Sequence, residues 1–474
     1  KQALGQRSEH GLIAFPEAGR GIGMFLRTHF FQGEAGAHRT QLGGLGHGQA
    51  VREAFEQTGA VGVARAGGVR HVDMLDMPDN QYHSTTDPHF DTIRPFTDAE
   101  VHDAIVELLR DEEFRHFADT FGFDLSPESE TLLSEQVRTI FDFKRLFISA
   151  GLSGLLDKTT FSTTISGTSN LDREGQTKYL LVSNHRDIIL DSAILDLLFM
   201  QSGLSMPRMT LGDNLLKRPW IRTLVKLCDA VVVKRGLPVR ETLIESKRLS
   251  EYIRTAVEQG EEHIWLAQRD GRAKDSNDTT QPGLLKMLTL SAPRGMSIAE
   301  SIESLHVVPM AISYEYDPCD ALKAVELLAR RRNPDYQKQP TEDLVSMRTG
   351  LSGRKGRVHI KVAEPLHDLA SLYEPEASKN EQLAAIAREI DRQIFLNYRF
   401  YPSNYIAYDI VRGGDQFDSM YSRKERLLFE LYVEEQMDAA KVATKDREEV
   451  AHMIFDAYAN PLVNNLITRK IIRR

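Results

Sequence analysis

Apolar and polar positions follow two alternating patterns from about residue 161 to residue 365. Short apolar runs of strand length are followed by stretches in which apolar residues recur three or four positions apart, as on one face of a helix. This alternation is typical of an α/β domain in which a central mixed sheet is flanked by helices. The predicted strands are 163–166, 179–182, 208–211, 230–234, 263–267, 306–313 and 358–362, and the predicted helices between them are 187–201, 215–227, 240–258 and 283–291.

Helical patterns flank this α/β domain on both sides. Thr97 and Glu100 have the spacing of a capping box in front of a helix. Ser126-Pro127 then opens a further helix, because Pro is favoured at the first helical position. The apolar positions that follow predict that this helix runs past Phe141. The N-terminal helical region is taken as 77–160 and the C-terminal one as 366–474, with C-terminal helices near 379–398, 423–441 and 445–458.

The first 76 residues differ from the rest of the chain in composition. They hold 15 of the 32 glycines and show no sustained period of a strand or a helix. Ordering such a segment costs more backbone entropy than its scattered apolar residues can offset. We therefore expect residues 1–76 to be a disordered or artefactual leader, with the natural start at Met74 or Met77.

Charge and cysteine content narrow the class of protein. The 474 residues include 59 Lys and Arg against 68 Asp and Glu, and the net charge of −9 argues against a general nucleic-acid binder. Cys228 and Cys319 give neither a disulfide framework nor metal-ligand spacing, which suits a reducing compartment. The most apolar stretch, 188–200, is interrupted by Asp191 and Asp196, so no membrane span is expected.

The first candidate for chemistry is His185, which lies where a predicted strand turns into a predicted helix. An imidazole has a reference pKa of about 6.5 and can accept a proton at neutral pH. Carboxylates follow at Asp187 and Asp191, and either one could orient the ring through its other nitrogen. The alternative is a histidine that only caps the helix.

Two more polar clusters follow predicted strands, and a fourth strand carries a proline. Lys234 and Arg235 end one strand, and the stretch 268–275, Gln-Arg-Asp-Gly-Arg-Ala-Lys-Asp, follows another. Pro309 lies within the strand 306–313. Residues at the carboxyl ends of the strands of an open α/β sheet meet at one edge, so these clusters are expected to share a site.

These blocks, in this order, resemble those of the glycerolipid acyltransferase family, which includes glycerol-3-phosphate and 1-acyl-glycerol-3-phosphate acyltransferases. The resemblance covers about 160–320 and is strongest to a bacterial branch of the family. The family pattern is His, four residues, Asp; then an apolar pair with x-Arg; then Glu-Gly-x-Arg; then an apolar-Pro strand. Here five residues separate His185 from Asp191, Asp270 replaces the Glu, and Arg272 follows Gly271 directly.

The resemblance implies an O-acyltransferase of phospholipid synthesis. It would move a fatty acyl group from acyl-CoA or acyl-carrier protein to the hydroxyl of lysophosphatidate or glycerol 3-phosphate. His185 would be the general base and Asp191 its partner, with Asp187 as the rival partner. No Ser or Cys nucleophile is placed by a motif, so no acyl-enzyme is expected, and no metal or cofactor besides the acyl donor.

The remaining cluster residues are expected to bind substrate. Backbone N–H groups around Gly271 are candidate oxyanion donors, and Arg235, Arg272 and Lys274 are candidates for holding the phosphate of the acceptor. We expect a cytoplasmic protein, peripheral on the inner membrane face, that does not bind nucleic acid. Two other interpretations stay open: an O-acyltransferase for another lysolipid such as an amino-acid lipid, and a catalytically inactive membrane-associated scaffold.

A chain that begins at Met77 should keep full activity and a nearly unchanged melting temperature, because the leader adds no patterned apolar surface to a core. Melting curves and acyl-transfer rates of the two forms check this expectation. A drop of several degrees, or the loss of most activity, would show that the leader belongs to the fold.

Overall fold

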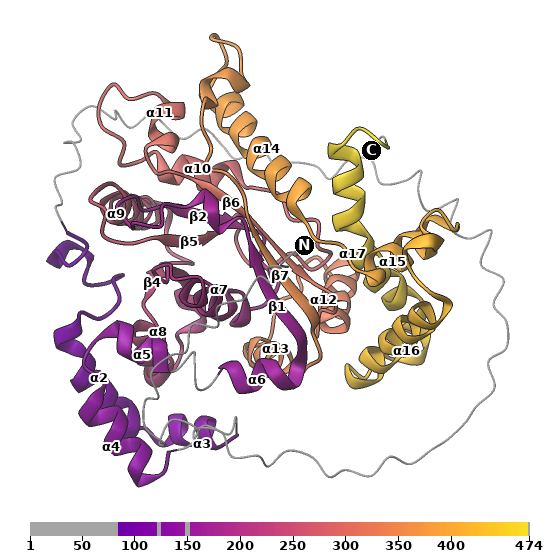
Figure 1. Ribbon diagram of the computed structural model, residues 1–474, viewed down its shortest axis with the longest axis horizontal. Helices are drawn as coiled ribbons and strands as arrows, with labels where there is room; N and C mark the ends of the chain where they lie inside the picture. The colour runs from indigo at the N-terminus through magenta and orange to yellow at the C-terminus, as the bar shows by residue number, and fades with distance from the viewer. Residues whose placement is uncertain (1–83, 121–124, 147–151, 473–474) are drawn as a thin grey trace, which may run out of the picture.

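The computed structural model describes residues 84–120, 125–146 and 152–472 (Figure 1), so the predicted leader and a start at Met77 lie outside the described residues. Within the described residues, seven strands form one sheet in the order β1-β7-β6-β2-β5-β3-β4. All seven predicted strands are present, with bounds shifted by a few positions at most. They are β1 Thr160–Ser166, β2 Leu180–Ser183, β3 Arg208–Gly212, β4 Ala230–Val233, β5 Ile264–Ala267, β6 Val308–Tyr314 and β7 Gly356–Val362.

The sheet is mixed, as predicted. Only β6 and β7 pair antiparallel, and all the other neighbours pair parallel. Parallel neighbours need crossover connections, which place the carboxyl ends of β2, β3, β4 and β5 at one edge of the sheet. His185, Asp213, Arg235 and the 268–275 stretch follow these four ends, so the fold brings the candidate clusters to a common edge.

Side chains alternate between two cores along each strand. Leu180 and Val182 of β2 join one core, while Leu181 between them joins the other. Helices α9 Val239–Glu258, α10 Pro282–Leu288, α11 Ile298–Glu303 and α14 Lys379–Asn397 contribute to the first core. Helices α6 Ser153–Thr159 and α7 Leu190–Gln201 contribute to the second, on the opposite face (Figure 1).

The C-terminal region is helical, as predicted, but it does not form one unit. Helix α14 packs into the core of the sheet, whereas the three later helices build a separate core with α12, which follows β6. The last predicted helix extends to Thr468 and includes Pro461. The elements are α12 Asp320–Arg332, α13 Pro340–Ser352, α15 Pro402–Arg412, α16 Arg423–Ala439 and α17 Arg447–Thr468. Helices α11, α12, α13 and α15 were not predicted, and the predicted domain boundaries stay predictions.

The N-terminal region forms a small helical layer with α8 Pro219–Leu227. Thr97 and Glu100 form the predicted capping box of α2. The region contains η2 Pro88–Phe90, α2 Asp98–Arg110, α3 Glu112–Thr120, α4 Pro127–Gln136 and α5 Ile140–Leu146. None of the helices in the part of the chain that the structure describes is long and apolar enough to cross a membrane.

The prediction of one helix from Ser126 past Phe141 is wrong. Helix α4 ends at Gln136 and α5 begins at Ile140. The backbone N–H of Asp142 donates to Thr139 Oγ1 at 3.0 Å, and the N–H of Thr139 donates to Asp142 Oδ2 at 3.2 Å. This second capping box starts a new helix where the apolar pattern alone suggests continuation.

Candidate active site

The loop between β2 and α7 is fixed at its start by Asn184. The side chain of Asn184 donates to the Ile312 carbonyl at 2.9 Å and accepts from the Ile312 N–H at 2.8 Å. Ile312 lies in β6, the strand next to β2. The side-chain amide therefore continues the sheet ladder by one residue and holds the position from which His185 projects.

His185 and Asp191 form a hydrogen-bonded pair. His185 Nδ1 lies 2.8 Å from Asp191 Oδ2, and the side chains are 17% and 0% exposed respectively. Oδ2 also accepts from the backbone N–H groups of Arg186 and Asp187, at 2.5 and 3.0 Å. A carboxylate held in this way accepts Nδ1–H, which leaves Nε2 as the basic nitrogen. Nε2 has no hydrogen-bond partner among the described residues, and the ring packs edge-on against Trp265.

Asp187, the rival partner, has another role. Its Oδ1 accepts from the backbone N–H groups of Ile189 and Leu190, at 2.9 and 2.8 Å, at the start of α7. Its Oδ2 faces α13, where a Cβ added at Gly350 would lie 2.1 Å away. Burial, followed by the charge of Asp191, raises the pKa of Asp187. Asp187 is therefore a buried helix cap, and the imidazole pairs with Asp191.

Arg235, at the end of β4, contacts the stretch 268–275 that follows β5. Its guanidinium forms an ion pair with Asp270, and its backbone N–H donates to Asp213 Oδ1 at 3.1 Å. The side chain lies against Gly212, where an added Cβ would be 2.4 Å from Nε. Gly271 follows in an exposed turn at φ +68°, a conformation that glycine adopts without strain.

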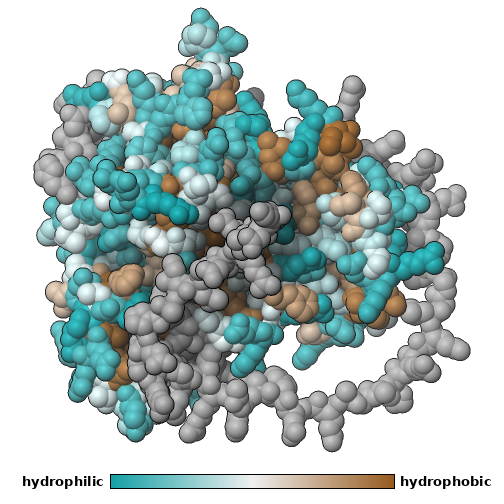
Figure 2. Space-filling model, in the orientation of Figure 1, coloured by the Kyte–Doolittle hydropathy of each residue, from teal (hydrophilic) through white to brown (hydrophobic). Residues whose placement is uncertain are grey.

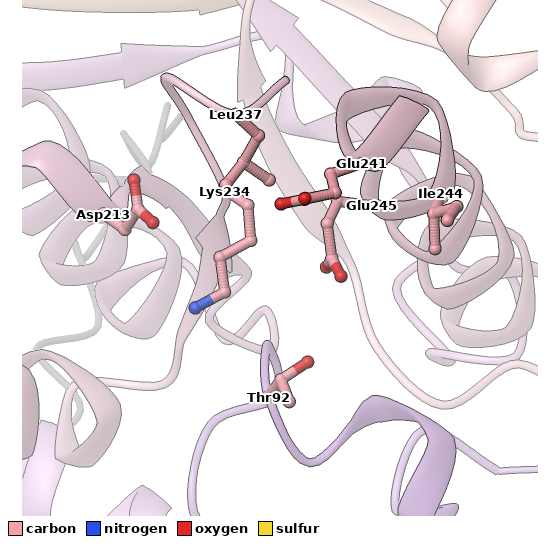
Figure 3. Close-up of a pocket in the computed structure, with 7 residues that line it drawn as sticks. All are labelled: Thr92, Asp213, Lys234, Leu237, Glu241, Ile244 and Glu245. Carbon is pink, nitrogen blue, oxygen red and sulfur yellow. The ribbon is translucent and has the colours of Figure 1, made fainter. Parts of the chain in front are cut away.

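A pocket of about 330 Å³ opens at the end of β4, next to Arg235 (Figure 3). Lys234 points into it among the carboxylates of Asp213, Glu241 and Glu245. Three acidic side chains against one lysine make this pocket unsuited to a phosphate. A phosphate site formed by the predicted residues therefore has to lie elsewhere, closer to His185.

Arg272 and Lys274 differ in what they contact. Arg272 is 8% exposed and makes no hydrogen bond or ion pair with another described residue, and its charge partly offsets the rise in the pKa of Asp187. Lys274 Nζ lies 2.7 Å from Glu326 Oε2 on α12. Burial, and then the charge of Arg272, lowers the pKa of Lys274 to about 8. Arg272 is thus available for an anionic ligand, whereas Lys274 is already paired.

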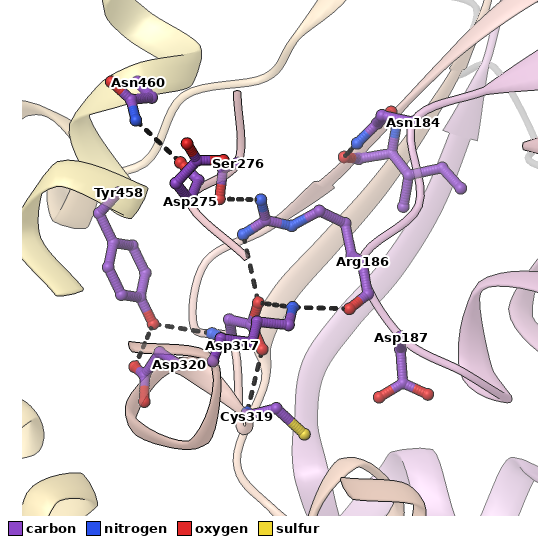
Figure 4. A network of polar contacts seen from close by, with 12 residues as sticks. Asn184, Arg186, Asp187, Asp275, Ser276, Asp317, Cys319, Asp320, Tyr458 and Asn460 are labelled. Carbon is purple, nitrogen blue, oxygen red and sulfur yellow. Dashed lines mark hydrogen bonds and ion pairs between the residues drawn. The ribbon is translucent and has the colours of Figure 1, made fainter. Parts of the chain in front are cut away.

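Sequence reasoning missed a buried ionic network next to His185 (Figure 4). Arg186 Nη1 donates to Ser276 Oγ, and Nη2 lies 3.4 Å from Asp317 Oδ2. Lys323 forms an ion pair with Asp317 and donates to the carbonyl of Arg186 at 2.8 Å. The network joins the β2–α7 loop to the 268–281 segment and to α12.

Helix α17 reaches the same network from the C-terminal region (Figure 4). The Tyr458 hydroxyl donates to Asp320 Oδ2 at 2.9 Å and accepts from the N–H of Asp317 at 2.8 Å. Asn460 Nδ2 donates to the carbonyl of Asp275 at 2.8 Å. These contacts join residues more than 100 positions apart, so no local pattern in the sequence could have indicated them.

Part of the chain matches a known protein family. Residues 162–313 match the model of the Acyltransferase family, and this segment includes His185, Asp191 and the third block. A search of curated protein sequences returned no match. Among solved structures, the 1-acyl-sn-glycerophosphate (LPA) acyltransferase PlsC from Thermotoga maritima is similar over 64% of this chain and 96% of that chain, at 12% identity and a TM-score of 0.31. A likeness this weak adds nothing to the family match. The predicted family resemblance is confirmed by that match for residues 162–313, which form an acyltransferase domain.

Asp191→Asn should lower kcat by about 10²–10⁴-fold, because an amide cannot stabilise the imidazolium and presents the wrong hydrogen-bonding group to Nδ1. Asp187→Asn should keep most of the activity and stability, because Asn also caps helices well. Steady-state rates and melting curves of the two variants check this. A larger loss of kcat for Asp187→Asn would mean that the imidazole pairs with Asp187 during turnover.

Proposed function

We propose that the chain transfers a fatty acyl group from acyl-CoA or acyl-carrier protein to the hydroxyl of lysophosphatidate or glycerol 3-phosphate. The observation that carries this proposal is the His185–Asp191 hydrogen bond of 2.8 Å inside the acyltransferase domain, with no partner for Nε2 among the described residues. A base with one oriented and one free nitrogen is what activation of a hydroxyl requires.

The reaction proceeds by direct attack. His185 Nε2 accepts the proton of the acceptor hydroxyl as that oxygen bonds to the thioester carbonyl carbon, and Asp191 stabilises the imidazolium. The carbon–sulfur bond then breaks, and the departing thiolate takes the proton from Nε2 and leaves as a thiol. The ester is formed, the imidazole is neutral again, and no acyl-enzyme is needed. Backbone N–H groups around Gly271 stabilise the oxyanion.

Arg272 is the main ligand for the phosphate of the acceptor. A guanidinium that is 8% exposed and has no partner among the described residues is costly to bury, unless an anion binds it. Arg235 contributes less because Asp270 already neutralises part of its charge. Lys274 contributes through the local field, since Glu326 already binds its ammonium group.

The enzyme acts at the cytoplasmic surface of a membrane, where lysolipid and glycerolipid acceptors meet an acyl donor. Support comes from α16, on which Leu427, Leu428 and Leu431 are 46–55% exposed. Arg423 and Lys424 are exposed on the same helix. Figure 2 shows hydrophobic side chains at the surface on the α16 side of the molecule. Exposed leucines on one helix are typical of helices that lie on a lipid surface.

Release of free thiol from acyl-CoA, measured with a panel of acceptors, tests the proposal. Glycerol 3-phosphate or lysophosphatidate should stimulate release, and His185→Ala should lower the rate by about 10²–10⁴-fold without loss of the fold. His452→Ala is a matched control, because His452 also lies near a carboxylate, 3.6 Å from Asp456, but is 48% exposed on α17. That variant should be fully active.

Other results of this assay would select another function. Stimulation only by a different lysolipid, such as an amino-acid lipid, would retain the enzyme class and replace the acceptor. No thiol release with any acceptor would favour an inactive scaffold.

Arg272→Ala should raise the KM for a phosphate-bearing acceptor more than the KM for the thioester. Losing a charge-assisted hydrogen bond costs on the order of 1.5–3 kcal/mol. Arg235→Ala should have a smaller effect in the same direction, because Asp270 already occupies that guanidinium. Initial rates with each substrate varied separately measure both constants. Equal effects on the two substrates would place Arg272 at the acyl donor.

A further inference from the structure

Several buried polar side-chain atoms of the described residues have no hydrogen-bond partner, and some of them belong to the proposed active site. Among the described residues, ten buried side-chain nitrogen or oxygen atoms have no partner. Native proteins leave few such atoms, and each one calls for an explanation. Arg272 and Asp191 account for two of the ten and belong to the site already described. Gln268 and Asp278 account for four, because both polar atoms of each side chain have no partner.

Asp278 is a buried carboxylate that nothing in the described protein neutralises by contact. It is 1% exposed, and it makes no hydrogen bond through either oxygen. Burying a carboxylate without donors is unfavourable by several times the net value of a hydrogen bond. Burial of the Asp278 carboxylate therefore lowers the stability of the folded protein.

Three residues around Asp278 are anchored. Ser276 accepts a hydrogen bond from Arg186, and Asn277 Oδ1 accepts from Asn464 of α17 at 3.0 Å. Thr280 donates through its N–H and its hydroxyl to Asp391 of α14, at 2.7 Å each. The segment is thus fixed on both sides of Asp278, and the carboxylate is held in place without a partner of its own.

The segment that carries this carboxylate contacts the loop of the proposed general base. Ser276, two positions earlier, contacts Arg186, which directly follows His185. The charge of His185 itself acts on Asp278. Alternation along β5 directs Gln268 to the face covered by α10 and α14, the same side on which Asp391 anchors Thr280.

The need to balance the charge of Arg186 does not fully explain why a carboxylate is buried at position 278. Arg186 already lies 3.4 Å from Asp317, and its Nη1 is bound to Ser276. Arg186, Lys323 and Arg269 all act on Asp278 through their charge, yet none of them donates a hydrogen bond to it. Electrostatics accounts for a negative charge at this position, but the two oxygens still lack donors.

We propose that Asp278 binds the acceptor by accepting a hydrogen bond from a second hydroxyl, adjacent to the one that His185 activates. The inference rests on the proposed function and selects between its two acceptors. A carboxylate only accepts, so its ligand must be a donor, and the surrounding cations disfavour an ammonium group. Glycerol 3-phosphate carries a second hydroxyl, whereas the equivalent oxygen of lysophosphatidate is already esterified. The acceptor is therefore glycerol 3-phosphate.

Stability measurements separate this role from a structural one. Burial raises the pKa of Asp278 to about 6, despite the nearby cations. A carboxyl whose pKa is higher in the folded state than in the unfolded state lowers the stability of the fold as the pH rises. The loss runs from the unfolded-state pKa up through about 6. Asp278→Asn should therefore raise the melting temperature at pH 8 and change it little at pH 4. A structural partner of Arg186 would give a lower melting temperature at pH 8.

The kinetic test compares the two acceptors. The wild-type chain should acylate glycerol 3-phosphate with a higher kcat/KM than lysophosphatidate. Asp278→Ala should raise the KM for glycerol 3-phosphate about tenfold or more and change the rate with lysophosphatidate by less than about twofold. Asp320→Asn is the matched control, because Asp320 is equally buried but hydrogen-bonded to Tyr458 and to the N–H of Ala321. It should leave the ratio between the acceptors unchanged.

Two results would overturn the inference while leaving the proposed function intact. One is a wild-type preference for lysophosphatidate. The other is an equal loss of activity on both acceptors in Asp278→Ala, accompanied by a lower melting temperature. If the wild-type chain acylates neither acceptor, the proposed function itself fails and the inference fails with it.

Discussion

One buried oxygen organises the proposed catalytic loop. Asp191 Oδ2 accepts from His185 Nδ1 and from two successive backbone N–H groups, those of Arg186 and Asp187. The backbone donors fix the carboxylate, and the carboxylate fixes both the turn of the chain and the orientation of the ring. The same interaction thus shapes the link between β2 and α7 and prepares the base. Asp187 is then free to cap the helix that follows.

Much of the fold could be predicted because it depends on local patterns. The buried strands show as short apolar runs, and the capping box at Thr97 is contained within four residues. Helix α12 was missed because its inner face carries Asp320, Lys323 and Glu326, which are buried and charged. A helix that buries charged residues beside a few small apolar ones shows only a weak apolar period. The break between α4 and α5 depends on the polar pair Thr139 and Asp142, which hydrophobic periodicity ignores.

The candidate site, like the fold, has features that local sequence patterns predict and features that depend on distant residues. His185 and Asp191 lie six positions apart, so their pairing can be read from a strand-to-helix turn and a carboxylate in the first turn of the helix. The state of Lys274 depends on Glu326 of α12. The setting of Asp278 depends on neighbours anchored by α14 and α17, more than 100 positions away. Sequence patterns locate a residue on an element, but they do not show which distant side chains neutralise it.

The strand order has a consequence for how the chain reaches this structure. β1 opens the acyltransferase segment, yet among the described strands it pairs only with β7, which begins at Gly356, beyond the matched residues 162–313. The register joins Thr163 to Val358 across nearly 200 residues. Closing so long a loop is entropically slow, and β1 has no strand to pair with until β7 has left the ribosome. During synthesis the segment that carries His185 and Asp191 therefore stays incomplete at one edge of its sheet. The matched segment by itself therefore lacks the strand that pairs with β1.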